Sequence, residues 1–204
     1  MSIPADTFFV TTPATNFKSK AEAQLAGIDY FFYVADNHDL LVKTFEGNVS
    51  YTLASNVKWV DVIPTTDRIH VYYLTAANRI MHLVFEQFGA GNLTATDTGV
   101  DGVLTTFSVN YAANSTPPAY LLLFDDGVNH VLCVASDPNF LLLLAPAGLV
   151  VYRNSNSAYN VTRPTIAVHP LDTNVATINV QQIRISDNDT KVGFYVVPIP
   201  GVTG

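Results

Sequence analysis

The sequence predicts an all-β protein, built as a β-propeller-like array of about four four-stranded antiparallel blades. Short runs rich in Val, Ile, Leu, Tyr and Phe fill the chain, and Asp, Asn, Gly or Pro closes each run. Such runs are typical of strands, and almost no segment repeats its apolar residues at helical spacing. A similar strand–turn–strand unit also recurs, and units of about 40 to 55 residues have the size of a propeller blade. A β-sandwich or barrel is the alternative, because amphipathic hairpins resemble one another in every all-β fold.

The first two elements differ in kind. Segment 19–27, SKAEAQLAG, is the one expected exception to the strands, because it predicts a helical turn or two with Ser19 as N-cap and Gly27 as stop. A hairpin follows at 28–47, and its sequence lies without a gap over 68–87 at a constant offset of 40 (68 minus 28). The residues that are identical in the two copies are Tyr33 and Tyr73, Phe45 and Phe85, and Glu46 and Glu86.

Two further hairpins follow along the chain. A weaker third copy begins at Ala119, and the same strand–turn–strand form occupies 176–200. Other strand-like runs precede the later hairpins, at 57–64, 104–111 and 164–170. Another run follows each of the first three hairpins. The chain therefore holds about four units of about four strands each, and a single all-β domain over residues 1–204 accounts for its length.

The composition excludes several classes of protein. Hydrophobic residues make up 49% of the chain and charged residues 13%, which excludes large-scale disorder and is typical of strands buried on both faces. The formal net charge is -7 at pH 7, and Lys and Arg form no cluster, so nucleic acid is not an expected partner. The longest apolar run, 140–152, is shorter than the roughly 20 residues of a membrane span. We therefore expect no membrane span.

The sequence also bears on location and on catalysis. The amino-terminal residues lack the basic and apolar regions of a secretory signal, so the expected location is the cytoplasm, or outside the cell by a non-classical route. The single cysteine, Cys133, lies in the apolar run HVLCVA, which favours a buried thiol over a catalytic one. No nucleophile elbow, phosphate-binding glycine loop or metal-ligand spacing is present. We expect a non-enzymatic protein without a cofactor, although carboxylates distant in sequence could still form a glycosidase pair.

The hairpin at 68–87 holds the strongest candidate for a binding site. Its odd positions form an apolar set, which comprises Ile69, Val71, Tyr73, Met81, Leu83 and Phe85. If the odd residues pair with one another, the register couples even positions with even positions. His70 then lies opposite His82 or, one step along, Arg68 lies opposite Glu86. In either register these side chains share one face with Tyr72.

Three roles are open to this polar face. Two opposed histidines could bind a metal, but a transition-metal site needs a third or fourth ligand that the nearby sequence does not supply. The face could hold a sugar, with an aromatic ring stacked on it and Arg, His or Glu binding its hydroxyl groups. It could also be a half-buried strand face whose polar tips reach water or backbone.

A family resemblance bears on these alternatives. Segment 57–87, VKWVDVIPTTDRIHVYYLTAANRIMHLVFEQ, resembles a blade of the fungal fucose-specific lectins, whose repeats carry an IRVYYQ-type strand, a short turn and an I.EL strand. The resemblance implies a propeller fold and carbohydrate binding. Here His70 stands where the sugar-binding Arg of that family would be, after Ile69, and His82 stands where its Glu would be, two residues after Ile80. The resemblance therefore bears on the fold more than on fucose.

Together these observations predict a carbohydrate-binding, lectin-like protein without catalytic activity, whose partner is a glycan or another small molecule. The expected ligand-binding residues are Trp59, Arg68, His70, Tyr72, His82 and Glu86, with Trp59 as the stacking platform. A structural or assembly protein, for example of a virus particle, is the alternative from another class, and an enzyme with a small apolar pocket in the propeller is the third. If the blades do not close a ring, a second copy would cover the exposed blade faces, which predicts a homo-oligomer.

Overall fold

The computed structural model describes ten stretches of the chain. These are residues 19–47, 49–86, 93–103, 106–114, 118–125, 129–140, 148–153, 159–168, 175–184 and 190–198. All regular structure in these stretches is β, which confirms the predicted fold class. Within the same stretches, no helix has the length and apolar character that crossing a membrane would require.

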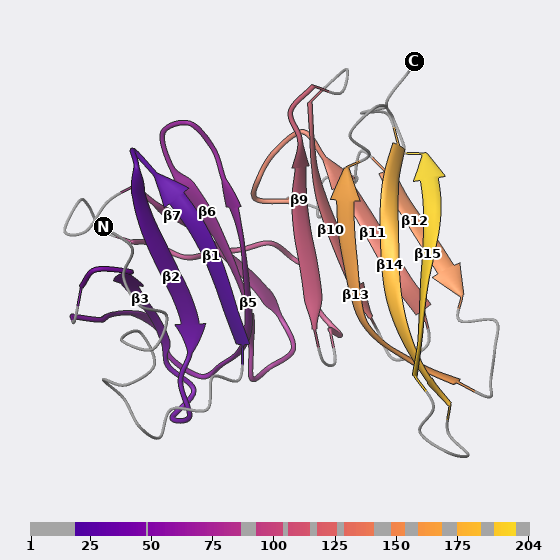
Figure 1. Cartoon of the computed structure of the whole chain (residues 1–204), viewed down its shortest axis with the longest axis horizontal. Coiled ribbons are helices and arrows are strands. Elements are labelled where there is room, and N and C mark those ends of the chain that lie inside the picture. Colours follow the sequence, from indigo (N-terminus) through magenta and orange to yellow (C-terminus); the bar gives the residue numbers. More distant parts are fainter. Residues whose placement is uncertain are drawn as a thin grey trace.

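The strands form four antiparallel sheets in which neighbours in sequence are neighbours in space (Figure 1). The first sheet has the order β1 (Ser19–Leu25), β2 (Ile28–Val34), β3 (Leu40–Thr44), β4 (Tyr51–Ala54). The second has β5 (Val57–Pro64), β6 (Ile69–Thr75), β7 (Ile80–Phe85), β8 (Thr96–Asp97). The third has β9 (Phe107–Ala112), β10 (Ala119–Asp125), β11 (Asn129–Ala135), β12 (Gly148–Arg153). The fourth has β13 (Tyr159–Val168), β14 (Val175–Arg184), β15 (Thr190–Pro198).

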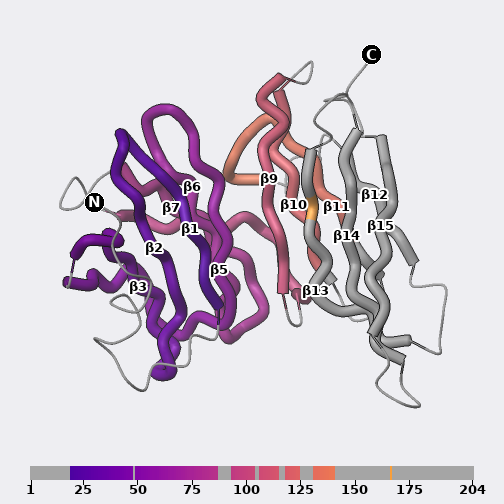
Figure 2. The backbone as a smooth tube through the Cα atoms, viewed as in Figure 1, coloured from indigo at the N-terminus to yellow at the C-terminus, as the bar shows by residue number. Residues whose placement is uncertain are grey.

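The first strands of the four sheets lie next to one another, which is the arrangement of propeller blades. Strand β1 packs on β5, β5 on β9, and β9 on β13, so the four form a row that runs from left to right in Figure 1. The backbone trace of Figure 2 shows the same sequence of β1, β5 and β9. Within the described strands, β13 makes no comparably extensive contact with β1. The array is therefore propeller-like, with its first and fourth blades at the two ends of the row.

Side-chain hydrogen bonds link the first strands of the four sheets, which we call the inner strands. Each of them is an edge strand of its own sheet. The Ser19 hydroxyl accepts a hydrogen bond from the Val60 amide at 3.1 Å and donates one to the Val60 carbonyl at 3.2 Å, which joins the first blade to the second. The Asp61 carboxylate accepts from the Val109 amide of the third blade at 2.9 Å. The Asn110 amide group donates to the Ile166 carbonyl of the fourth blade at 3.0 Å. These bonds satisfy edge-strand polar groups that would otherwise lack partners in the interior.

The hydrophobic core lies between the blades. The even positions of the first hairpin, such as Phe32 and Val42, form one apolar cluster with the odd positions of the second, such as Val71 and Leu83. A second cluster joins the opposite face of the second blade to the third blade. Both faces of the second sheet are therefore buried, which explains why so little charge occurs along its strands.

The prediction of a helical turn or two at 19–27 is wrong, because Ser19–Leu25 is strand β1. Its burial alternates: Ser19, Ala23 and Leu25 are buried, whereas the charged and amide side chains between them are exposed. This period of two belongs to a strand with one buried face, and pairing with β2 outweighs helix propensity. Gly27, predicted as a helix stop, instead lies in the two-residue turn to β2, where its φ is 79° and that of Ala26 is 51°.

Candidate functional site

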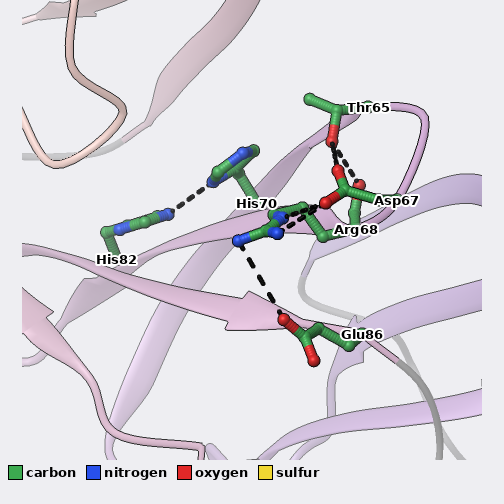
Figure 3. A network of polar contacts seen from close by, with 6 residues as sticks. All are labelled: Thr65, Asp67, Arg68, His70, His82 and Glu86. Atoms are coloured by element: carbon green, nitrogen blue, oxygen red, sulfur yellow. Dashed lines mark hydrogen bonds and ion pairs between the residues drawn. The ribbon is translucent and has the colours of Figure 1, made fainter.

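The register of the β6–β7 hairpin places its even side chains on one face. Tyr72 pairs with His82, and His70 pairs with Val84. Of the two registers that the sequence allows, this is the one that continues to Arg68 opposite Glu86. The guanidinium Nη1 of Arg68 lies 4.0 Å from the Glu86 carboxylate (Figure 3). The expectation that these side chains share a face is confirmed.

Two histidines and an asparagine form a hydrogen-bonded chain between the second and third blades. His70 Nδ1 lies 3.0 Å from His82 Nε2, so the two rings meet diagonally across the strand pair (Figure 3). His82 Nδ1 lies 2.7 Å from Oδ1 of Asn139 on the third blade. His70 is 5% exposed and His82 is 2% exposed. The pair is therefore an interior feature with its partners supplied across the interface.

Tyr72 holds the same loop of the third blade. Its hydroxyl donates to the Pro138 carbonyl at 2.6 Å, and its ring stacks on His82 at 4.8 Å between centroids. The Asn139 amide donates to the Asp137 carboxylate, which forms a local turn that fixes the asparagine. Phe140 follows in the left-handed region, with a φ of 47°, and its ring is fully buried against Tyr72. Tyr72 and His82 thus clamp this loop to the second blade.

Arg68 lies at the end of the hairpin as part of an exposed ionic group. Its guanidinium donates two hydrogen bonds to the Asp67 carboxylate, besides its approach to Glu86 (Figure 3). The Thr65 hydroxyl donates to the Arg68 carbonyl at 3.0 Å. The Arg68 side chain is 40% exposed, and the nearby carboxylates of Asp67 and Glu86 offset its positive charge. The hydrogen bond from Arg68 is the largest of the contributions that hold the pKa of Asp67 below its usual value.

A cleft of about 550 Å³ opens between this hairpin end and the third blade, and we name it the interblade cleft. Its described lining comprises Thr65, Thr66, Asp67, Arg68, His70, Tyr111, Ala113, Tyr120 and Pro138. Tyr111 and Tyr120, which are cross-strand partners, stack with centroids 4.5 Å apart and planes 27° apart. The edge of Tyr120 meets His70 at 5.6 Å between centroids. The cleft thus combines an aromatic wall with donors and acceptors from the second blade.

The two tyrosines line the cleft of the candidate site, and the sequence reasoning missed them. They belong to β9 and β10, and the signal that could have found them is the Tyr at each end of the loop that joins these strands. Tyr111 and Tyr120 meet because β9 and β10 pair in antiparallel register. Nothing in the hairpin at 68–87 reveals that another blade supplies its aromatic neighbour.

Trp59 lies apart from the cleft. It pairs with Leu74, toward the opposite end of the strand pair from Arg68. Its indole N–H donates to the Phe107 carbonyl at 3.0 Å, and the ring packs on the apolar cluster between the second and third blades. The structure therefore gathers Arg68, His70 and Glu86 at one end of the hairpin but does not bring Trp59 to them.

Burial governs the electrostatics of the inner face. Desolvation, with smaller contributions from His82 and Arg68, lowers the pKa of His70 to about 4. Desolvation also lowers the pKa of His82, although the hydrogen bond to Asn139 opposes this. Burial raises the pKa of Asp61 to about 6 against the hydrogen bonds from Val109, Val62 and Ser108. Both histidines are therefore neutral at pH 7.

Two other expectations concern metal ions and the thiol. Across the described stretches, no group of three or more His, Cys, Asp or Glu side chains is placed to hold a metal ion. The facing nitrogens of His70 and His82 are hydrogen-bonded to each other, so neither points its lone pair toward a shared metal ion. Cys133 is buried in the cluster between the second and third blades, and burial raises the pKa of its thiol to about 12. A thiol with so high a pKa has little of the thiolate that nucleophilic catalysis needs.

Comparison with known proteins supports the fold. No protein-family model matches the chain, and no curated protein matches it in sequence. An endo-arabinase from Bacteroides thetaiotaomicron is similar in structure, with a TM-score of 0.58 and 12% sequence identity over 96% of this chain and 83% of that chain. A triple arginine-to-alanine mutant of AofleA from Arthrobotrys oligospora gives a TM-score of 0.41 with 9% identity, over 93% of this chain and 72% of that chain. At such low identity, the likeness to the endo-arabinase concerns the fold alone.

Proposed function

We propose that this protein binds carbohydrate without catalysing a reaction, and that the interblade cleft is its binding site. One observation carries the proposal: the cleft sets the stacked rings of Tyr111 and Tyr120 against the polar groups of Asp67, Arg68 and His70. A sugar ring presents apolar C–H groups on its faces and hydroxyl groups around its edge. An aromatic wall facing a few oriented polar groups is complementary to that pattern.

The charge of the cleft favours a neutral sugar. The guanidinium of Arg68 is already paired with Asp67 and lies near Glu86, so two carboxylates compensate one cation. The whole chain carries a formal charge of -7 at pH 7. An acidic sugar would meet these carboxylates, whereas the hydroxyl groups of a neutral sugar can donate to Asp67 and accept from Arg68.

The resemblance to fungal fucose-specific lectins supports the same cleft from the sequence. Of the two positions that correspond to sugar contacts in that family, His70 lines the cleft and His82 lies directly behind it. Because the residue types differ, the proposal is carbohydrate binding as a class.

A glycan array with soluble competitors tests this proposal. Tyr120→Ala should abolish binding that Tyr120→Phe retains, because the phenylalanine keeps the ring. Arg68→Ala should weaken the same binding. Arg79→Ala is the matched control, because Arg79 forms a comparably exposed ion pair with Asp97 at the other end of the blade. Selective binding that responds in this order supports the proposal, and an array without competable binding contradicts it.

Assembly with further copies of the chain is the second candidate function. It is favoured by the row of inner strands, in which β1 and β13 occupy opposite ends. Val49 and Tyr51, beside and within the outer strand β4, are also 62% and 49% exposed. A second copy could cover such surfaces and edges. Size-exclusion chromatography with light scattering should then give a defined oligomer whose mass falls in Tyr51→Asp, and a monomer at all concentrations would exclude this candidate.

A further inference from the structure

His70 joins the buried chain of hydrogen bonds to the interblade cleft. It is 5% exposed, and its Nδ1 bonds to His82 Nε2. Its other ring nitrogen, Nε2, has no hydrogen-bond partner among the described residues. Among the described residues, Thr106 Oγ1 is the one fully buried side-chain nitrogen or oxygen without a hydrogen-bond partner. His70 Nε2, which also has no partner, is therefore accessible to solvent. Since His70 lines the cleft, Nε2 is the group through which it can reach a ligand.

The direction of the hydrogen bonds fixes which nitrogen of His70 carries the proton. Asn139 Oδ1 can only accept, so His82 Nδ1 must carry a proton and donate to it. A neutral imidazole has one N–H, so His82 Nε2 is then an acceptor. His70 Nδ1 must therefore donate to His82 Nε2. The same rule leaves His70 Nε2 without a proton, with its lone pair available at the cleft.

We propose that His82 and Asn139 are positioning residues that hold His70 in its Nδ1–H tautomer, and that Nε2 of His70 accepts a hydrogen bond from a hydroxyl group of the bound saccharide. The nature of the ligand rests on the proposed function. The tautomer does not, because it follows from groups of the chain itself.

The groups around His70 keep it neutral and therefore able to accept. Its titratable and charged neighbours are Asp67, Arg68 and His82 of the second blade, and Asp137 and Tyr120 of the third. Burial, His82 and Arg68 disfavour the charged imidazolium form of His70. Their combined effect exceeds the opposite effect of Asp67 and Asp137. Acidification toward pH 4 would protonate Nε2, turn the acceptor into a donor and weaken saccharide binding.

Long-range ¹H–¹⁵N spectra of the full chain at pH 7 test the tautomer directly. In the wild-type protein, His70 and His82 should both be protonated at Nδ1 and unprotonated at Nε2. Asn139→Leu removes the acceptor and should bring a signal of Nε2-protonated His70, whereas Asn139→Asp keeps an acceptor and should preserve the wild-type tautomer. His38, whose Nδ1 bonds to the Val57 carbonyl elsewhere, is the internal control. A wild-type His70 that is protonated at Nε2 would overturn the proposal, as would a tautomer unchanged in Asn139→Leu.

Titration with methyl glycosides tests the contact with a ligand. We would use the methyl glycosides of glucose, galactose and mannose, with methyl glucuronoside as the acidic comparison. A neutral glycoside should shift the His70 Nε2 resonance, and its affinity should fall about tenfold in Asn139→Leu but not in Asn139→Asp. Binding that leaves His70 Nε2 unmoved would overturn the contact. Absence of binding with the tautomer as expected would instead overturn the saccharide and leave the positioning of His70 intact.

Discussion

The hairpins of the first two blades pair their strands in the same way but differ in chemistry. Tyr30 pairs with Thr44 in the first, and His70 pairs with Val84 in the second, so the registers coincide after a shift of 40 residues (70 minus 30). The turn residues His38 and Asn78, which the same shift relates, both have a positive φ, at 66° and 63°. The scaffold is therefore common to the two blades.

The interior positions of the two hairpins are equally buried. Tyr30 and Val42, which correspond to His70 and His82, are 2% and 0% exposed. They pack in the apolar cluster between the first two blades, and the edge of Tyr30 meets Phe85. In the second hairpin the same positions hold a polar chain that needs Asn139 as its terminal acceptor. A polar interior is thus sustained where the next blade supplies a partner.

The ends of the hairpins differ in the same sense. The first has a cleft of about 290 Å³, lined by Gly27, Ile28, Asp29, Thr44, Phe45 and Glu46. Ile28 stands where Arg68 stands in the second blade, and it is 47% exposed. The larger interblade cleft also has the Tyr111–Tyr120 wall from the neighbouring blade. The contrast teaches that the candidate site depends on the packing of two blades rather than on one hairpin.

The largest expected effect comes from giving the second hairpin a residue of the first. His82→Val, which reproduces Val42 of the first hairpin, should lower the free energy of unfolding by about 2–4 kcal/mol. It opens a cavity and removes the hydrogen-bond partner of the buried His70 and of the half-buried Asn139. Urea unfolding followed by tryptophan fluorescence measures this change. His38→Asn, which gives this turn the residue that the second hairpin has at Asn78 and suits the positive φ, should cost much less, and an equal cost for both would contradict the contrast between the hairpins.

The pH dependence of stability should reveal two opposed groups. The pKa of folded His70 is about 4 against an ordinary 6.5, so the unfolded chain binds more protons between these values and acidification destabilises the fold by up to about 3 kcal/mol. The pKa of folded Asp61 is about 6 against an ordinary 3.8, so its contribution is fully present below 3.8 and is lost as pH rises through 6. The two contributions oppose each other between about pH 4 and pH 6.

Asp61→Asn separates these contributions. Relative to the wild-type protein, the variant should lose stability more steeply as pH falls from 6 to 4, because the opposing contribution is gone. Urea midpoints at several pH values give the two curves. Parallel curves would show that Asp61 has an ordinary pKa in the folded protein.

Tyr72→Phe should have a smaller effect. It removes one hydrogen bond, from the Tyr72 hydroxyl to the Pro138 carbonyl, and keeps the ring contacts with His82 and Phe140. We expect a loss of about 1 kcal/mol in the free energy of unfolding. Hydrogen exchange at the Asn139 and Phe140 amides should also become faster. Unchanged exchange there would mean that Tyr72 does not hold this loop.

Arg68→Ala should change stability least. Arg68 and its two carboxylate partners are exposed, and surface ion pairs contribute little to folding. The urea midpoint should therefore match that of Arg79→Ala within error, while glycan binding falls only in Arg68→Ala. A marked loss of stability in Arg68→Ala would assign it a structural role instead.

Several features of the site follow from local pattern alone. The alternation of Ile69, Val71 and Tyr73 with polar residues determines that one face of the hairpin enters a core, and the pairing of like parities then puts His70 and His82 on the other face. The same logic failed for Ser19–Leu25, where the alternation competes with residues of good helix propensity. Trp59 was expected at the site because it is the lone tryptophan, but its position along β5 takes it toward the other end.

The sequence by itself determined the all-β class, the blade-sized units and the shared polar face, because these depend on periodicities of two residues and on turns between near neighbours in the chain. Only the tertiary structure decided that this face is buried, that Asn139 and Pro138 receive its hydrogen bonds, and that Tyr111 and Tyr120 complete the cleft. These partners lie on another blade. Their approach depends on how two sheets pack, and contacts between residues far apart in sequence leave no local pattern from which to infer them.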